Sequence, residues 1–171
     1  MKRLAVLFVL ASIPAAAQVP VTPAANQASF LADKDPHLAA NKKLVYDFWR
    51  TLLVAGHTAE AEKYMAEGYI QHNPMVPTGR AAFVEMRDRI PKKADVPATI
   101  PNLVAITADG DLVTLAFLDE NPNPAKPGTT YTTTRFDMLR VSGGKVVEHW
   151  DDAHLGEAPP GPPPTGGPSP H

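Results

Sequence analysis

The pattern of apolar and polar residues divides the chain into a helical first half and a strand-rich second half. Across residues 37–56 apolar side chains recur every three or four positions, which predicts an amphipathic helix. Its apolar face is formed by Leu38, Leu44, Val45, Phe48, Leu52 and Leu53. A second helix is predicted over residues 58–68. A third is predicted from residue 79 to residue 90, where Pro91 ends it.

The second half has the pattern of antiparallel strands. Residues 98–120 hold two predicted strands around the turn sequence Asp109-Gly110-Asp111, and residues 129–141 are rich in β-branched and aromatic side chains. Ser142-Gly143-Gly144 then turns the chain into a last strand over residues 145–150. Helices followed by antiparallel strands predict the α+β class, with the helices packed on one face of a strongly curved antiparallel sheet.

The two ends of the chain differ from the domain between them. Residues 1–17 combine Lys2 and Arg3, a short apolar run and three alanines, which predict a signal peptide and an exported (periplasmic or secreted) protein. A retained membrane anchor is the alternative. Residues 18–36 are expected to be a flexible leader and residues 37–155 the folded domain. Residues 156–171, rich in Pro and Gly, are expected to be a disordered tail.

Composition narrows the partners and the chemistry. The chain has no cysteine, which excludes a thiol nucleophile, a disulfide framework and thiolate metal sites. Without Lys2 and Arg3 the 16 basic residues become 14 against 18 acidic ones, a net charge of −4 with histidine neutral. This charge disfavours binding to nucleic acid or to anionic lipid. We therefore expect no nucleic-acid partner and no stable membrane insertion after cleavage.

Two segments resemble a known family. "YIQHNP", residues 69–74, and "GGKVVEHWD", residues 143–151, are similar to the SnoaL-like, polyketide cyclase-like proteins of the nuclear transport factor 2 superfamily, and the resemblance extends over residues 38–152. It implies a cone-shaped fold with an internal apolar cavity, acid–base chemistry without a metal or organic cofactor, and frequent homodimers. It also implies Asp151 as the acid–base carboxylate and Asp137 as its polar partner. Because one fold serves many functions, it does not determine the activity.

Strand alternation places Arg135 and Asp137 on one face of their strand, and His149 and Asp151 on one face of the last strand. A three-residue hairpin loop would set Asp137 opposite His149, whereas a two-residue Gly-Gly loop would set Asp137 opposite Trp150. We prefer the first register, because it gathers the four side chains on one surface. Two carboxylates and a histidine in a dry pocket can divide into a proton donor and a base. A plain salt bridge between Arg135 and Asp151 is the alternative.

Four further residues have two interpretations each. His72 and Asn73 lie in a predicted turn, where their side chains would bond to nearby backbone. Alternatively they border the cavity, with His72 sharing the proton transfer. Trp49 and Tyr69 fit core positions, and their alternative is a place in the wall of a substrate pocket.

The preferred hypothesis is cofactor-free acid–base chemistry on a small carbonyl compound: aldol-type condensation, isomerisation or dehydration. The expected catalytic residues are Asp151 as principal base, Asp137, His149 and His72, and the expected substrate contacts are Arg135, Asn73, Trp49 and Tyr69. The alternatives are a non-catalytic domain that binds a small apolar ligand, and a structural module that forms a homodimer. A metal site of His72, His149 and Asp151 is disfavoured, because no HxH or HExxH spacing is present.

Overall fold

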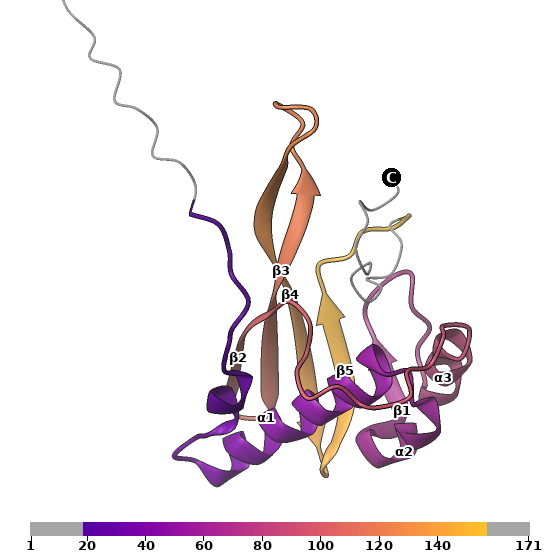
Figure 1. Cartoon of the computed structure of the whole chain (residues 1–171). Coiled ribbons are helices and arrows are strands. Elements are labelled where there is room, and N and C mark those ends of the chain that lie inside the picture. The colour runs from indigo at the N-terminus through magenta and orange to yellow at the C-terminus, as the bar shows by residue number, and fades with distance from the viewer. Residues whose placement is uncertain (1–18, 157–171) are drawn as a thin grey trace, which may run out of the picture.

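The structure is a computed structural model that describes residues 19–156 (Figure 1). The predicted signal peptide and nearly all of the predicted Pro/Gly-rich tail lie outside the described residues. Among the described residues no helix is both long enough and apolar enough to cross a membrane.

Five strands form one curled, open sheet: β1 (Met65–Gln71), β2 (Leu103–Asp109), β3 (Leu112–Pro122), β4 (Thr130–Ser142) and β5 (Lys145–Asp151). Their spatial order is β1-β5-β4-β3-β2. The pairs β2–β3, β3–β4 and β4–β5 are antiparallel, as predicted for consecutive strands. The edge strand β1 pairs in parallel with β5, so the sheet is mixed. The α+β class with helices on one face of a curved sheet is confirmed.

The first predicted helix is present as α1 (Pro36–Phe48), which crosses one face of the sheet (Figure 1). The Asp35 side chain caps its first turn by accepting from the His37 backbone N–H at 2.8 Å. The helix continues as a π-helical segment, Trp49–Val54, and the chain then turns at Gly56, which has a φ of 74°. The third predicted helix is present as α3 (Arg80–Arg87).

The second predicted helix is wrong beyond Tyr64. A 3-10 turn, Thr58–Glu60, leads into the short α2 (Ala61–Tyr64), and the chain then extends as β1. Met65 and Tyr69 are both fully buried, and a spacing of four residues fits either a helix or a strand. Backbone pairing with β5, which sequence periodicity does not reveal, selects the strand.

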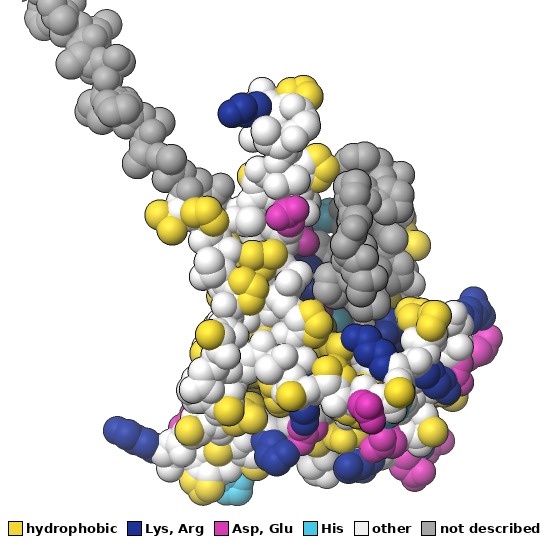
Figure 2. All heavy atoms as spheres, in the orientation of Figure 1, with side chains coloured by type: hydrophobic (Ala, Val, Ile, Leu, Met, Phe, Trp, Pro, Cys, Tyr) yellow, Lys and Arg dark blue, Asp and Glu magenta, His cyan; other side chains and the backbone are white. Residues whose placement is uncertain are grey.

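The core lies between α1 and the inner face of the sheet. It includes Val45, Phe48, Trp49, Leu52, Val113, Leu115, Phe117, Leu139, Val141 and Val146. On the opposite, outer face of the sheet Ile70 and Phe136 are 45% and 53% exposed. Figure 2 views the molecule from the side of α1, where most charged side chains gather over the helices and few over the β3–β4 hairpin. The helices therefore present a solvated surface outward and an apolar one inward.

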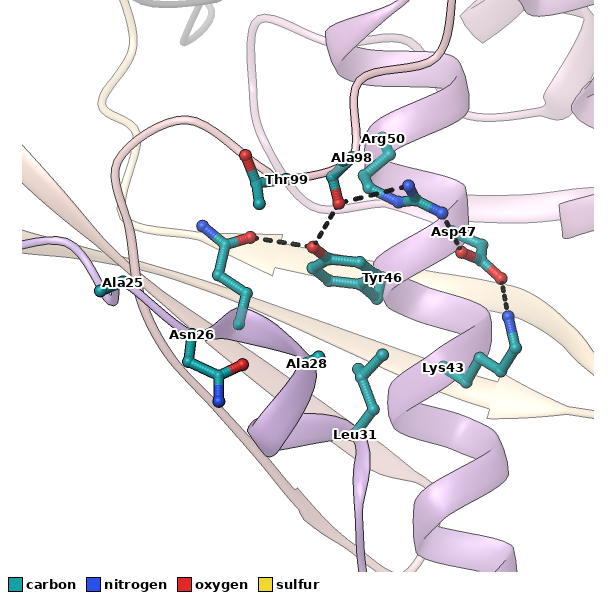
Figure 3. Close-up of a pocket in the computed structure, with 11 residues that line it drawn as sticks. Ala25, Asn26, Ala28, Leu31, Lys43, Tyr46, Asp47, Arg50, Ala98 and Thr99 are labelled. Carbon is teal, nitrogen blue, oxygen red and sulfur yellow. Dashed lines mark hydrogen bonds and ion pairs between the residues drawn. The ribbon is translucent and has the colours of Figure 1, made fainter.

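Part of the segment expected to be a flexible leader packs against the domain. Gln27, only 5% exposed, donates from Nε2 to the Ile100 carbonyl at 2.8 Å and accepts from the Ile100 N–H at 2.8 Å. The Tyr46 hydroxyl lies 3.0 Å from Gln27 Oε1 and 3.0 Å from the Ala98 carbonyl (Figure 3). A surface pocket of about 320 Å³ borders this contact. These bonds anchor the segment at Gln27.

Candidate active site

The β4–β5 hairpin determines which side chains share the inner face. Gly143 and Gly144 both have positive φ, 56° and 71°, in a two-residue turn that pairs Ser142 with Lys145. The predicted three-residue loop is therefore wrong. An irregularity after Arg140 leaves Val147 as an extra residue in β5 and changes the register beyond the turn.

With this bulge, Asp137 lies opposite Asp151, and Leu139 lies opposite His149. Both predicted pairings of Asp137, with His149 and with Trp150, are therefore wrong. The actual register differs from the preferred one by two residues, and a shift of two keeps every side chain on its face. The expectation that Asp137, His149 and Asp151 share one surface is thus correct.

Asp137 is a buried carboxylate, 1% exposed, that serves two donors. Arg135 Nη1 lies 2.5 Å from its Oδ2, and His149 Nε2 lies 3.0 Å from its Oδ1. His149 is itself only 8% exposed. The alternative salt bridge between Arg135 and Asp151 is therefore wrong, because Arg135 pairs with Asp137 on its own strand. Two charge-assisted bonds compensate for the loss of hydration of the buried carboxylate.

Aromatic rings support this ion cluster. The Trp49 ring lies 4.9 Å from the Phe117 ring and 6.4 Å from the His149 ring, between centroids. The Arg135 guanidinium lies 4.6 Å from the Phe117 centroid, in a cation–π arrangement. Trp49 thus belongs to the core and also borders the cluster. These rings lower the local dielectric and strengthen the interactions of Asp137.

Asp151 is the more accessible carboxylate of the site, since it is only half-buried. Its Oδ2 accepts from Asn73 Nδ2 at 2.7 Å, and its Oδ1 accepts from the Ala153 N–H at 3.2 Å. Asp151, His149 and Asp137 each present one atom within 4.8 Å of the other two. Asn73 also accepts from the Met75 N–H at 2.8 Å, so it both closes the turn and holds Asp151.

Tyr69 lies on β1 and is 1% exposed. Burial raises the pKa of its phenol far above the usual range, and the charges of Asp151 and Asp137 raise it further. The group therefore stays protonated in the folded protein. Its oxygen accepts from Gln71 Nε2 at 3.0 Å.

Gln71 contacts the cluster but was missed by the sequence reasoning. Its amide lies 2.9–3.0 Å from His149 Nδ1. Strand alternation places Gln71 on the same face as Tyr69, which is a signal that would have identified it had residues 65–71 been predicted as a strand.

His72 is not brought to the cluster. Its Nε2 lies 2.8 Å from Glu148 Oε1, and its ring stacks on Trp150 at 5.1 Å, on the outer face of the sheet. The hydrogen bond from His72, followed by that from Arg140, lowers the pKa of Glu148 below its ordinary value despite an opposing effect of desolvation. This placement gives no support to a share of His72 in proton transfer at the inner face.

The donor atoms of Asp137, His149 and Asp151 are of the types that bind a divalent cation. Their present bonds do not fit one, because the Arg135 cation already pairs with Asp137 and His149 bonds to the same carboxylate. The ligand trio considered from sequence, which included His72, is not assembled. The expectation that no metal or cofactor is needed stays a prediction.

Two surface pockets of the described residues lie elsewhere. One, about 320 Å³, lies between residues 25–31, α1 and residues 98–99, and the other, about 590 Å³, lies between α2, β1 and α3. Neither includes Asp137, His149 or Asp151 in its lining. The internal cavity stays a prediction.

Comparisons with known proteins agree with the sequence resemblance. Residues 45–149 match the model of the SnoaL-like domain family. None of the curated proteins matches the sequence significantly. One similar solved structure is TsrD from Streptomyces laurentii, with 17% identity, a TM-score of 0.44, and coverage of 70% of this chain and 90% of that one.

Two further solved structures are similar. One is a protein classed as a SnoaL-like polyketide cyclase from Jannaschia sp. CCS1, with 16% identity, a TM-score of 0.47, and coverage of 71% of this chain and 91% of that one. The other is an LEH-like epoxide hydrolase of M. tuberculosis, with 13% identity, a TM-score of 0.47, and coverage of 68% and 84%. Because the family model spans more than half of the chain, this protein belongs to the SnoaL-like domain family.

Proposed function

We propose that this protein is an exported, cofactor-free enzyme that carries out acid–base chemistry on a small carbonyl compound, by aldol-type condensation, isomerisation or dehydration. The observation that carries the proposal is the inner-face cluster: a buried Asp137 shared by Arg135 and His149, next to the half-buried Asp151. Export rests on the predicted signal peptide.

In this proposal Asp151 is the base. Asp137 already accepts two charge-assisted bonds, and both His149 nitrogens have partners inside the protein. Asp151 accepts one side-chain bond, from Asn73, and a longer one from backbone, and it is more exposed than either. Its remaining lone pairs are available to remove a proton from the carbon next to a carbonyl group.

Arg135 is the group best suited to stabilise the enolate oxygen that forms. Its side chain is 22% exposed, and only one of its five N–H donors is used by Asp137. A fixed cation aimed at a developing oxyanion is worth about 3–4 kcal/mol of transition-state stabilisation, the range measured for one oxyanion-hole donor. Asp137 and the Phe117 ring hold the guanidinium in place for this task.

Proton exchange tests the proposal without knowledge of the product. Small ketones and aldehydes are incubated with the protein in D₂O, and NMR follows exchange at the carbon next to the carbonyl. We expect catalysed exchange that Asp151→Asn lowers by about 10²- to 10⁴-fold, the usual contribution of a positioned base. Asp152→Asn is the matched control, because Asp152 is an exposed neighbour. Equal rates in the two variants would reject Asp151 as the base.

Two observations favour the non-catalytic alternatives. Asp137 and His149 are almost fully buried and hydrogen-bonded within the protein, as in a purely structural cluster. Ile70 and Phe136 are exposed on the outer face of the sheet, which suits a dimerising module. Binding of a small apolar ligand without any proton exchange, followed by NMR shifts of the Trp49 indole, would favour a binding domain over an enzyme.

A further inference from the structure

We infer that Gln71 is a positioning residue that joins the two halves of the inner-face cluster and fixes His149 in the neutral form that carries its proton on Nε2. The first half is the Arg135–Asp137–His149 ion cluster, and the second is the Asn73–Asp151 pair. The catalytic consequence of this inference rests on the proposed function. The hydrogen-bond arrangement itself does not.

One backbone group orients the amide of Gln71. The Asn73 N–H can only donate, and it lies 3.0 Å from Gln71 Oε1, so the amide oxygen must face Asn73. The amide nitrogen then faces Tyr69 and His149, at 3.0 Å from the Tyr69 oxygen and 2.9 Å from His149 Nδ1. The two hydrogens of this nitrogen match these two acceptors in number. The amide oxygen, which already accepts from Asn73, lies 3.0 Å from the same Nδ1.

This orientation favours one position for the proton on His149. An amide nitrogen is only a donor, so the Nδ1 that receives it must present a lone pair. The proton of the neutral ring is then on Nε2, where Asp137 Oδ1 accepts it at 3.0 Å. The ion pair with Arg135 holds the Asp137 carboxyl group at the place where it meets the ring. Both ends of the imidazole therefore favour the same tautomer, and Gln71 Oε1 is the competing acceptor for a proton on Nδ1.

The same orientation leaves the Tyr69 proton available. Because the Tyr69 oxygen accepts from Gln71, its own O–H can donate elsewhere, and it has no acceptor among the described residues. Burial and the charges of Asp151 and Asp137 raise the pKa of this phenol, so it keeps its proton. Gln71 thus supplies the bond that the Tyr69 oxygen accepts and leaves its O–H able to donate.

Gln71 also reaches Asp151 through Asn73. The Asn73 residue is held by four bonds. Its N–H donates to Gln71, its Nδ2 donates to Asp151 Oδ2, its Oδ1 accepts from the Met75 N–H, and its carbonyl accepts from the Val76 N–H. Asn73 is 3% exposed, so no water can readily replace a missing partner. Loss of the Gln71 amide would therefore loosen the support of Asp151 as well as that of His149.

The position of Gln71 in the sheet makes these contacts possible. Gln71 is the residue of β1 that pairs with His149 of β5 in the parallel register. Its backbone N–H donates to Thr78 Oγ1 at 3.1 Å on the other side of the strand. The backbone of Gln71 is thus held by pairing with β5 on one edge of the strand and by the Thr78 hydroxyl on the other.

The first test uses the parent protein labelled with ¹⁵N on histidine. Two-bond ¹⁵N–¹H NMR spectra distinguish a neutral ring protonated on Nε2 from one protonated on Nδ1, and loss of one set of signals in His149→Gln assigns the His149 ring. The charged groups around the ring are Asp137 and its partner Arg135 from β4 and Asp151 from its own strand, while the π-helical segment contributes the Trp49 ring. We expect the Nε2–H pattern for His149 near neutral pH. An Nδ1–H pattern would overturn the inference.

Two variants extend the test. Gln71→Glu offers only acceptors, so Nδ1 should gain a proton and the ring should show the imidazolium pattern where the parent is neutral. Gln71→Met removes the amide and should shift the population toward a mixture of tautomers. Glu148→Gln is the matched control, because Glu148 lies on the same strand as His149 but bonds on the outer face. A His149 pattern unchanged in both Gln71 variants would contradict the inference.

Kinetics separates this inference from the proposed function. In the proton-exchange assay Gln71→Met should lower kcat by about 10- to 100-fold with KM little changed, the scale of losses known for groups that orient a reacting residue. If the parent catalyses exchange and Gln71→Met does so equally well, the positioning role is wrong. If the parent catalyses no exchange while the Nε2–H pattern is observed, the proposed function fails and the arrangement of Gln71 stands.

Discussion

Replacement of Asp137 by Asn tests the central cluster most directly. The side chain keeps its size and loses its charge, while Arg135 and His149 still point their donors at it. The oxygen of an asparagine can accept from Arg135 or from His149, and its NH₂ group, which is a donor, must then face the remaining donor. Asp137 is 1% exposed, so water cannot easily resolve this conflict.

The expected loss follows from the surroundings of each donor. Removal of one member of a buried ion pair costs about 3–5 kcal/mol of unfolding free energy. Here the cost is reduced, because the Arg135 side chain is 22% exposed and can be hydrated again. His149 can also move its proton to Nδ1, where Gln71 Oε1 lies 3.0 Å away. We therefore expect a loss of about 2–4 kcal/mol, toward the lower part of that range.

Urea unfolding monitored by tryptophan fluorescence measures this loss, with an unchanged dependence on denaturant as the sign that the folded state is preserved. Asp111→Asn is the matched control, because Asp111 also accepts from an arginine, Arg140, at 2.7 Å but is 51% exposed. Its unfolding free energy should stay close to that of the parent. Equal losses in the two variants would show that the buried pair is not a significant source of stability.

Three further predictions concern other parts of the molecule. His72 and Arg140 hold the pKa of Glu148 below its ordinary value of 4.5. The stability that this pairing gives is therefore present above pH 4.5 and is lost as the pH falls through the lowered pKa. Glu148→Gln should be less stable than the parent at neutral pH, and the unfolding curves of the two proteins should converge in acid. Trp49→Ala removes the ring packed on Phe117 and should cost about 3–5 kcal/mol in urea unfolding, whereas a loss below about 1 kcal/mol would place the ring outside the core. If the exposed Phe136 contacts a second copy of the chain, the parent should sediment as a dimer and Phe136→Glu as a monomer; a monomeric parent would reject the homodimer.

The sequence was sufficient for the fold class and most elements, and β1 shows where it was not. The helix of residues 37–56 and the strands β2 to β5 have a clear period, and each is present. Residues 65–71 have only two buried apolar side chains four positions apart, which fit a continued helix equally well. Their extended form depends on pairing with β5, a contact between segments about 80 residues apart.

The hairpin register shows a second limit of the sequence. The turn sequence allowed two loop lengths, and neither gave the actual pairing, because the bulge at Val147 lies three residues beyond the turn. A bulge adds one residue to one strand, and here it reverses the change of face that the shorter loop would have caused. The faces of Asp137 and His149 were therefore predicted correctly although the loop and the opposing residues were not.

The two segments that resemble the family supply most of the candidate site, and β4 adds Arg135 and Asp137. Tyr69, Gln71 and Asn73 come from "YIQHNP", and His149 and Asp151 come from "GGKVVEHWD". Their backbones meet where Gln71 pairs with His149, so β1 and β5 form a shared edge of the inner face. The side chains of this edge bond to one another through Gln71, whereas His72 and Glu148, one position away on each strand, bond on the outer face. Alternation along the two paired strands thus divides the side chains of these segments between the two faces of the sheet. Those on the inner face are suited to the proposed chemistry, and those on the outer face are suited to stability or association.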